Sequence, residues 1–147
     1  MKLLISILFL SWQSLAWAAL KFEVQLLHKD NVESCAVGDI DKDGDLDIVA
    51  GEHYYLNPAW KPIKFRSIKP FGKDYMQDNG DYLYDVDGDG DLDVFAGQFT
   101  LSEVLWFENP GKEGLRAEDS WTEHVLMDTG FKHNEMIFLR DMDGDGT

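Results

Sequence analysis

The sequence has very little cysteine. Cys35 is the single one among 147 residues, which excludes a disulfide bond within one chain. A reactive thiol or pairing between chains stays open, but the apolar stretch Cys35-Ala36-Val37 favours a small buried side chain. No cysteine directly follows the leader segment described below, which excludes the acceptor residue of a lipoprotein.

Basic residues are also scarce. The chain has 13 Lys and Arg against 28 Asp and Glu, so its net charge is -15. Such a chain repels phosphates, which excludes a nucleic acid as partner. High net charge is typical of disorder, but 13% aromatic and 44% hydrophobic residues are enough for a core. The acidic residues are clustered, which indicates bound cations.

Long apolar runs are absent except at the start of the chain. Lys2, the apolar run Leu3 to Trp12 and the small-residue pattern Ala16-Trp17-Ala18 resemble an export signal. We expect residues 1–18 to be a signal peptide and residues 19–147 to be the mature domain. A membrane anchor is the weaker interpretation, because a bilayer span needs about 20 apolar residues. The sequence therefore predicts a secreted, periplasmic or cell-surface protein that is not integral to a membrane.

The sequence carries no known catalytic spacing. It has no H-E-x-x-H zinc pattern and no recognisable triad, so we predict no catalytic residue in this segment. Glu52-His53 and His133-Asn134-Glu135 are polar enough for carbohydrate contact or proton transfer, whereas His124 is most simply a structural polar residue in a strand. Several aromatic residues are able to stack on sugars, although core packing is favoured for most: Tyr54, Tyr55, Trp60, Trp106 and Phe107.

What the sequence does contain is a repeat. "GDIDKDGDLDIVAG", Gly38 to Gly51, matches "YDVDGDGDLDVFAG", Tyr84 to Gly97, at an offset of 46 residues. A third copy begins at "RDMDGDGT", Arg140 to Thr147. In a strand, the alternating aspartates would form a ladder of like charges, which is destabilising. A bound cation would reverse that repulsion.

Counted from Asp39 or Asp85, carboxylates fall at positions 1, 3, 5, 7 and 9, with glycine at position 6. This pattern is similar to the first part of an EF-hand loop, in which position 7 binds through its backbone carbonyl. Position 12 is alanine rather than glutamate and a strand follows, which argues against an EF-hand. Hard oxygen ligands in this number favour Ca²⁺ over Mg²⁺ or softer metals. The predicted metal ligands are Asp39, Asp41, Asp43, Asp45, Asp47, Asp85, Asp87, Asp89, Asp91, Asp93, Asp141, Asp143 and Asp145.

The repeat extends beyond the acidic stretches and predicts an all-β fold. "YYLNPAW" resembles "WFENPG", and a third set of similar segments predicts half-buried outer strands at residues 21–27, 64–68 and 121–127. "LDIVAG" and "LDVFAG" are short, β-branched or aromatic, and closed by glycine, as buried strands are. No long amphipathic helix is evident. Each unit is therefore predicted to be a four-stranded antiparallel sheet of about 45 to 55 residues, the size of a propeller blade.

At the acidic stretches the chain resembles the FG-GAP/VCBS family of calcium-binding β-propeller repeats. The family motif of the D-x-D-x-D-G-x-x-D type matches residues 39–51 and 85–97 well and residues 141–147 in part. The resemblance implies a β-propeller with structural calcium in loops between strands, in an extracellular or cell-envelope setting. Relatives of this kind include integrin α-subunit heads, and related propellers occur in polysaccharide lyases and sugar dehydratases.

The chain holds about two and a half such units, whereas a closed propeller has about four to eight blades. We therefore expect it to be the N-terminal part of a longer protein. Three functions stay open: a calcium-stabilised module that binds carbohydrate or extracellular protein, part of a carbohydrate-active enzyme completed by further blades, or a purely structural calcium domain.

Overall fold

The computed structural model describes residues 20–134 and 137–144. The expected export signal at residues 1–18, together with Glu135 and Asp145, lies outside the described residues. The described chain is mostly β-structure in antiparallel sheets, which confirms the predicted all-β class.

The first sheet contains four short strands in chain order: β1 (Ala36–Gly38), β2 (Asp47–Ala50), β3 (His53–Tyr55) and β4 (Pro62–Lys64). All neighbouring pairs are antiparallel. Glycine ends β2, because Gly51 adopts a φ of 57° and turns the chain tightly into β3.

The second sheet repeats this arrangement with β7 (Gly80–Tyr84), β8 (Asp93–Gly97), β9 (Glu103–Glu108) and β10 (Thr122–Asp128), again antiparallel and in chain order. A two-stranded hairpin, β5 (Pro70–Phe71) and β6 (Tyr75–Met76), lies between the two sheets in the sequence. A seven-residue helix, α1 (Gly111–Ala117), separates β9 from β10. The sequence analysis had predicted no helix at this point.

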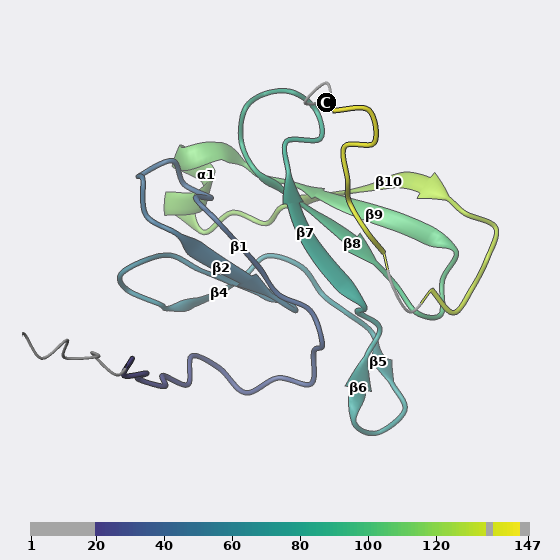
Figure 1. Cartoon of the computed structure of the whole chain (residues 1–147), viewed down its shortest axis with the longest axis horizontal. Helices are drawn as coiled ribbons and strands as arrows, with labels where there is room; N and C mark the ends of the chain where they lie inside the picture. Colours follow the sequence, from purple (N-terminus) through teal and green to yellow (C-terminus); the bar gives the residue numbers. More distant parts are fainter. Residues whose placement is uncertain (1–19, 135–136, 145–147) are drawn as a thin grey trace, which may run out of the picture.

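The hydrophobic core lies between the two sheets. Figure 1 shows them adjacent, with β1 next to β7 at the seam. Gly38 in β1 permits this approach, because a Cβ there would stand 2.8 Å from a methyl group of Leu83 in β7. Both sheets and the helix contribute core side chains: Ile40, Val49, Tyr54, Phe65, Val94, Ala96, Leu105, Phe107, Leu115 and Trp121.

Two of the predicted outer strands differ from the structure. Residues 21–27 form no strand, and Phe22 and Val24 are about nine-tenths exposed, because no strand of the described chain pairs with this segment. The strand predicted at residues 64–68 lies earlier, as β4, and Phe65 and Arg66 turn inward instead. The third, residues 121–127, corresponds to β10.

The prediction of a buried thiol is wrong, because Cys35 is exposed. It precedes β1, an edge strand in which the exposed and buried residues alternate, and its neighbour Ser34 takes the inward position. Core packing is confirmed for Tyr54, Tyr55 and Phe107, which are all buried. Within the described residues, no helix has the length and hydrophobicity that crossing a membrane requires.

Candidate metal centre

The first acidic stretch forms the loop between β1 and β2. Asp39 at position 1 closes it: one carboxylate oxygen accepts the backbone N–H of Asp43 at 3.0 Å, and the other accepts that of Gly44 at 3.0 Å. Gly44 at position 6 has a φ of 97°, which a side chain would oppose. The chain therefore curls around its own first carboxylate instead of continuing as a strand.

Asp47 at position 9 fixes the base of this loop. It is fully buried, and its two oxygens accept the backbone N–H groups of Ile40 and Asn57, each at 2.9 Å. The side-chain amide of Asn57 also donates to the carbonyl of Leu46 at 3.3 Å. The asparagine of "YYLNPAW" thus belongs to the loop, although it lies ten residues beyond it.

The second acidic loop, between β7 and β8, has the same hydrogen-bond frame. Asp85 accepts the backbone N–H groups of Gly88 at 2.8 Å and Gly90 at 2.9 Å. Asp93 is buried and accepts those of Val86 and Asn109, each at 2.9 Å. We use the term loop frame for these paired contacts of the position-1 and position-9 aspartates. The sequence repeat is therefore also a repeat of backbone geometry.

Within each loop, three carboxylates converge. One ligand atom each from Asp39, Asp41 and Asp43 lies within 4.8 Å of the others. In the second loop the converging residues are Asp85, Asp87 and Asp93. An oxygen of Asp41, Oδ1, is buried without a hydrogen-bond partner in the described chain. Such an atom is costly unless it has a partner, and a cation would provide one.

The crowding of negative charge changes the acidity of these groups. Burial, followed by the carboxylates of Asp43 and Asp47, raises the pKa of Asp41. Burial is also the largest cause that raises the pKa of Asp93, although its backbone hydrogen bonds oppose the shift. The ionised form of both carboxylates is therefore disfavoured in the empty loops, and a positive ion would stabilise that form.

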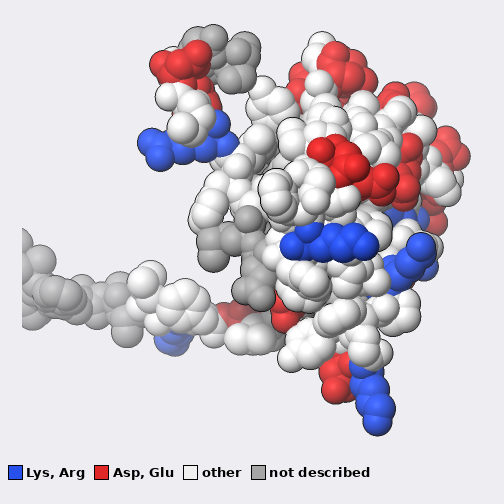
Figure 2. All heavy atoms as spheres, turned by 90° about the vertical axis from the view of Figure 1, so that its right-hand side faces the viewer, with Lys and Arg blue, Asp and Glu red and all other residues white. Residues whose placement is uncertain are grey.

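In the first two loops, four of the predicted ligands lie outside the converging groups: Asp45, Asp47, Asp89 and Asp91. The carboxylate of Asp91 instead pairs with Lys42 of the first loop at 2.7 Å. This places the two acidic loops beside each other, and Asn109 adds a second link by donating to the carbonyl of Ile40 at 3.2 Å. In Figure 2 the acidic side chains gather over the upper part of the face in view.

The third acidic segment begins with the same turn. Asp141 accepts the backbone N–H of Gly144 at 2.6 Å, as Asp85 accepts that of Gly88. Gly144 has a φ of 78°, close to the 79° of Gly88. Asp143 also donates its backbone N–H to Asp141. The described part of this segment therefore follows the second loop, while Asp145 lies outside it.

A buried ionic cluster, which the sequence analysis missed, joins the two sheets. Arg66 is buried and donates to Asp81 at 2.7 Å, to Asp78 at 3.3 Å and to the carbonyl of Gly51 at 2.7 Å. The hydroxyl of Ser34 lies within hydrogen-bond distance of both carboxylates and has one proton to donate to them. The guanidinium also lies 5.1 Å from the ring centroid of Phe107. Nothing in "FRSI" marks this arginine as buried, because its partners are far away in the sequence.

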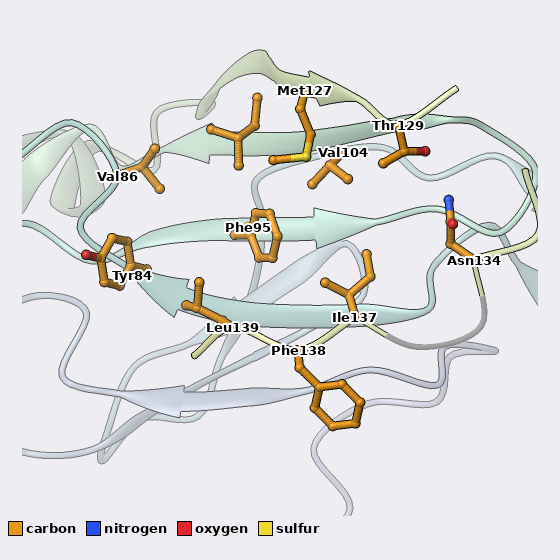
Figure 3. Close-up of a pocket in the computed structure, with 11 residues that line it drawn as sticks. Tyr84, Val86, Phe95, Val104, Met127, Thr129, Asn134, Ile137, Phe138 and Leu139 are labelled. Carbon is orange, nitrogen blue, oxygen red and sulfur yellow. The ribbon is translucent and has the colours of Figure 1, made fainter. Parts of the chain in front are cut away.

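A cavity lies on the face of the second sheet that is opposite the hydrophobic core. It has a volume of about 540 Å³ and is enclosed by the sheet and the segment 137–139. Figure 3 shows Phe95 and Val104 of the sheet on one side and Ile137 on the other, with the polar Thr129 and Asn134 at one end. It contains none of the acidic-loop carboxylates, and its lining is mostly apolar.

The two histidine clusters of the sequence analysis lie in different surroundings. His53 lies beside His28, with ring centroids 4.7 Å apart, whereas His133 packs on Phe99 at 5.0 Å. His124 is on β10, pairs with Glu108 at 2.7 Å and stacks on Trp106. His124 therefore has the structural environment that we expected.

Comparisons with known protein families, with curated protein sequences and with solved structures found no match to this chain. The interpretation of the acidic loops consequently rests on their own geometry.

Proposed function

We propose that this chain is an exported, non-catalytic calcium-binding module built from β-propeller repeats, in which the two acidic loops each hold a structural Ca²⁺. One observation carries the proposal: in both loops the aspartates at positions 1 and 9 accept backbone N–H groups, and three carboxylates, those at positions 1 and 3 among them, have ligand atoms within 4.8 Å of one another. A solvated acidic turn would have no reason to repeat this geometry.

The ligand chemistry supports calcium. Carboxylates and backbone carbonyls are hard oxygen ligands, and calcium accepts six to eight of them in flexible geometry. In the first loop, Asp39, Asp41 and Asp43 would hold the ion; in the second, Asp85, Asp87 and Asp93 would do so. We assign backbone carbonyl ligands at Asp45 and Asp91, whose carboxylates are not part of either group.

The ion would supply electrostatic compensation. Two carboxylates 4 Å apart repel each other by about 4 kcal/mol at an effective dielectric constant of about 20. The chain itself positions the carboxylates through the loop frame and connects the loops through the Lys42–Asp91 pair and the Asn109–Ile40 contact. An ion that offsets the carboxylate repulsion in one loop would thus also stabilise the contact between the two sheets.

The setting and the partner follow from the sequence. An export signal at residues 1–18 would deliver the chain to an extracellular or periplasmic space, where millimolar calcium is compatible with weak extracellular-type sites. The four-stranded meanders have the size and connectivity of propeller blades. We propose adhesion, by binding carbohydrate or an extracellular protein, as the use of such a module.

A calcium titration by calorimetry tests the ion sites. We expect the chelator-treated protein to bind calcium and the variant Asp41→Asn/Asp87→Asn to lose most of this binding, because each substitution removes a charge from one converging group. Asp74→Asn, on the exposed turn between β5 and β6, is the matched control and should bind as wild type does. Equal binding by all three proteins would refute the assignment of these loops.

A further inference from the structure

A second cluster of metal-binding side chains lies away from the acidic loops. His28, Asp30 and His53 each bring one ligand atom within 4.8 Å of the other two. His53 is on β3, while His28 and Asp30 are on the segment that precedes β1, 25 and 23 residues earlier in the chain. The fold therefore assembles a group that has no signature in the sequence.

One atom in this cluster lacks a partner. Nδ1 of His53 is buried and accepts or donates no hydrogen bond in the described part of the chain. The nearest carboxylate oxygen, Oδ2 of Asp30, lies 3.9 Å away, which is too far for a hydrogen bond. Because buried polar atoms are normally paired, this nitrogen requires an explanation.

The neighbouring charged groups are already engaged. Both oxygens of Glu52 are occupied, one by Lys64 at 2.9 Å and the other by the backbone N–H of Ile68 at 2.7 Å. One oxygen of Asp30 accepts the backbone N–H of Asn31, which leaves Oδ2 directed toward His53. The cluster thus consists of two imidazoles and one available carboxylate oxygen.

The segment that carries His28 and Asp30 is held in place beside β3. The carbonyl of Asn31 accepts the backbone N–H of Met76 at 3.2 Å. Val32 packs on Gly51, where an added Cβ would meet the valine methyl at 2.4 Å. These contacts fix the residues next to the cluster, while His28 itself is exposed and free to adjust.

From this arrangement we infer that His28, Asp30 and His53 form a site for a divalent transition metal, with Zn²⁺ as the best match. Two imidazoles and a carboxylate are a common ligand set for zinc, and imidazole selects such metals over calcium. Metal–ligand bonds of about 2.1 Å place tetrahedral ligand atoms about 3.4 Å apart. The present spacing of up to 4.8 Å therefore has to close by up to about 1.4 Å on binding, which the exposed His28 allows.

The site differs in function from the acidic loops and does not depend on them. It connects the chain before β1 to β3, and so fixes the N-terminal segment on the first sheet. Its fourth coordination position faces solvent, because two of its three residues lie on the surface. Water or an anionic group of a ligand is able to occupy that position.

Zinc calorimetry on the full chain, without a histidine tag and with calcium in excess to fill the acidic loops, tests this inference. We expect one zinc ion per chain in addition to any loop binding. His28→Ala/His53→Ala should weaken this binding by roughly tenfold or more, a loss already typical when only the outer partners of metal ligands are removed. His124→Ala/His133→Ala is the matched control, since it removes two histidines elsewhere, and should bind zinc normally.

The single variant His28→Ala separates loss of the site from misfolding, because removal of this exposed side chain should leave the fold intact. It too should weaken zinc binding, while its circular dichroism stays that of wild type. Cobalt(II) gives a second readout, since a four-coordinate site with these ligands produces visible absorption bands that the double variant should lose. Absence of zinc binding in wild type, or equal binding by the ligand and control variants, would overturn the site.

Discussion

At the residue scale, the aspartates of one loop divide into two roles. Asp47 and Asp93 are buried and use both oxygens to accept backbone N–H groups, so they hold the loop frame. Asp41 and Asp87 lie within the converging carboxylates, where the proposed cation would bind; Asp93 belongs to both sets, because it also joins the converging group of the second loop. Aspartates of one alternating pattern thus have different contacts, because the backbone around each of them differs.

The two asparagines of the loop frame offer a direct comparison. Asn109 is buried and its amide donates to Leu92 at 3.0 Å and Ile40 at 3.2 Å, whereas that of Asn57 donates once, to Leu46 at 3.3 Å. We predict that Asn109→Ala lowers the free energy of unfolding by about 1–3 kcal/mol, because it leaves buried carbonyls unpaired. Asn57→Ala is the control and should lower the free energy of unfolding by a smaller amount. Urea denaturation measures both, and the reverse order would contradict the assigned role of Asn109.

Asp78 gives a pH dependence with a definite sign. Burial and the carboxylate of Asp81 raise the pKa of Asp78 from 3.8 to about 6, against the opposing effect of Arg66. The folded state therefore holds this proton more tightly than the unfolded state. Its contribution to stability is present below pH 4 and is lost as pH rises through about 6.

We predict that Asp78→Asn removes this dependence. Between pH 4 and pH 7 in chelator, wild type should lose about 1–3 kcal/mol of stability relative to the variant. Urea denaturation of both proteins at each pH gives the difference. Parallel stability curves over that range would mean that Asp78 does not titrate as its surroundings indicate.

At the element scale, the sequence predicted most of the strands and missed what joins them. The strands β2 and β8 follow from short apolar runs closed by glycine, a local signal. The strand expected at residues 21–27 does not form, since a strand needs a partner that local sequence does not provide. The Arg66 cluster and the His28–His53 contact were not predictable, because their members are distant along the chain.

The Arg66 cluster should be the main polar contribution to the junction of the sheets. Arg66→Met leaves Asp78 and Asp81 buried without a positive partner, and we predict a loss of about 3–5 kcal/mol. Lys61→Met is the matched control: it breaks the exposed pair with Glu118, which is worth about 1 kcal/mol at most. Chemical denaturation compares the two variants. Similar small losses would show that the cluster adds little to the junction.

At the scale of the whole molecule, the excess of negative charge and the repeat have one explanation. A net charge of -15 concentrates in loops that lie side by side, joined by Lys42 and Asp91. Under the proposed function, cations would offset the repulsion between these carboxylates and so strengthen the contact between the sheets. The sequence predicted the acidic residues as a group of ligands, but not which of them converge, since that depends on the loop frame.

The charge imbalance predicts that one double substitution changes the melting temperature differently in chelator and in calcium. In chelator, Asp41→Asn/Asp87→Asn should raise the melting temperature slightly or leave it unchanged, because repulsion within each loop decreases. In calcium, the same variant should melt below wild type, because it binds the ion less well. The control Asp74→Asn should follow wild type in both conditions. A variant that melts below wild type equally in both would indicate a structural defect instead.

The central claim is tested most directly by the thermal melting of the wild-type chain in calcium and in chelator. Binding to the folded state adds RT ln(1 + [L]/Kd) to stability, about 2.7 kcal/mol at a hundredfold excess over Kd for each site. We predict a melting temperature that rises with calcium concentration and returns on addition of chelator. An identical melting temperature in both conditions would contradict the claim that these loops are calcium sites.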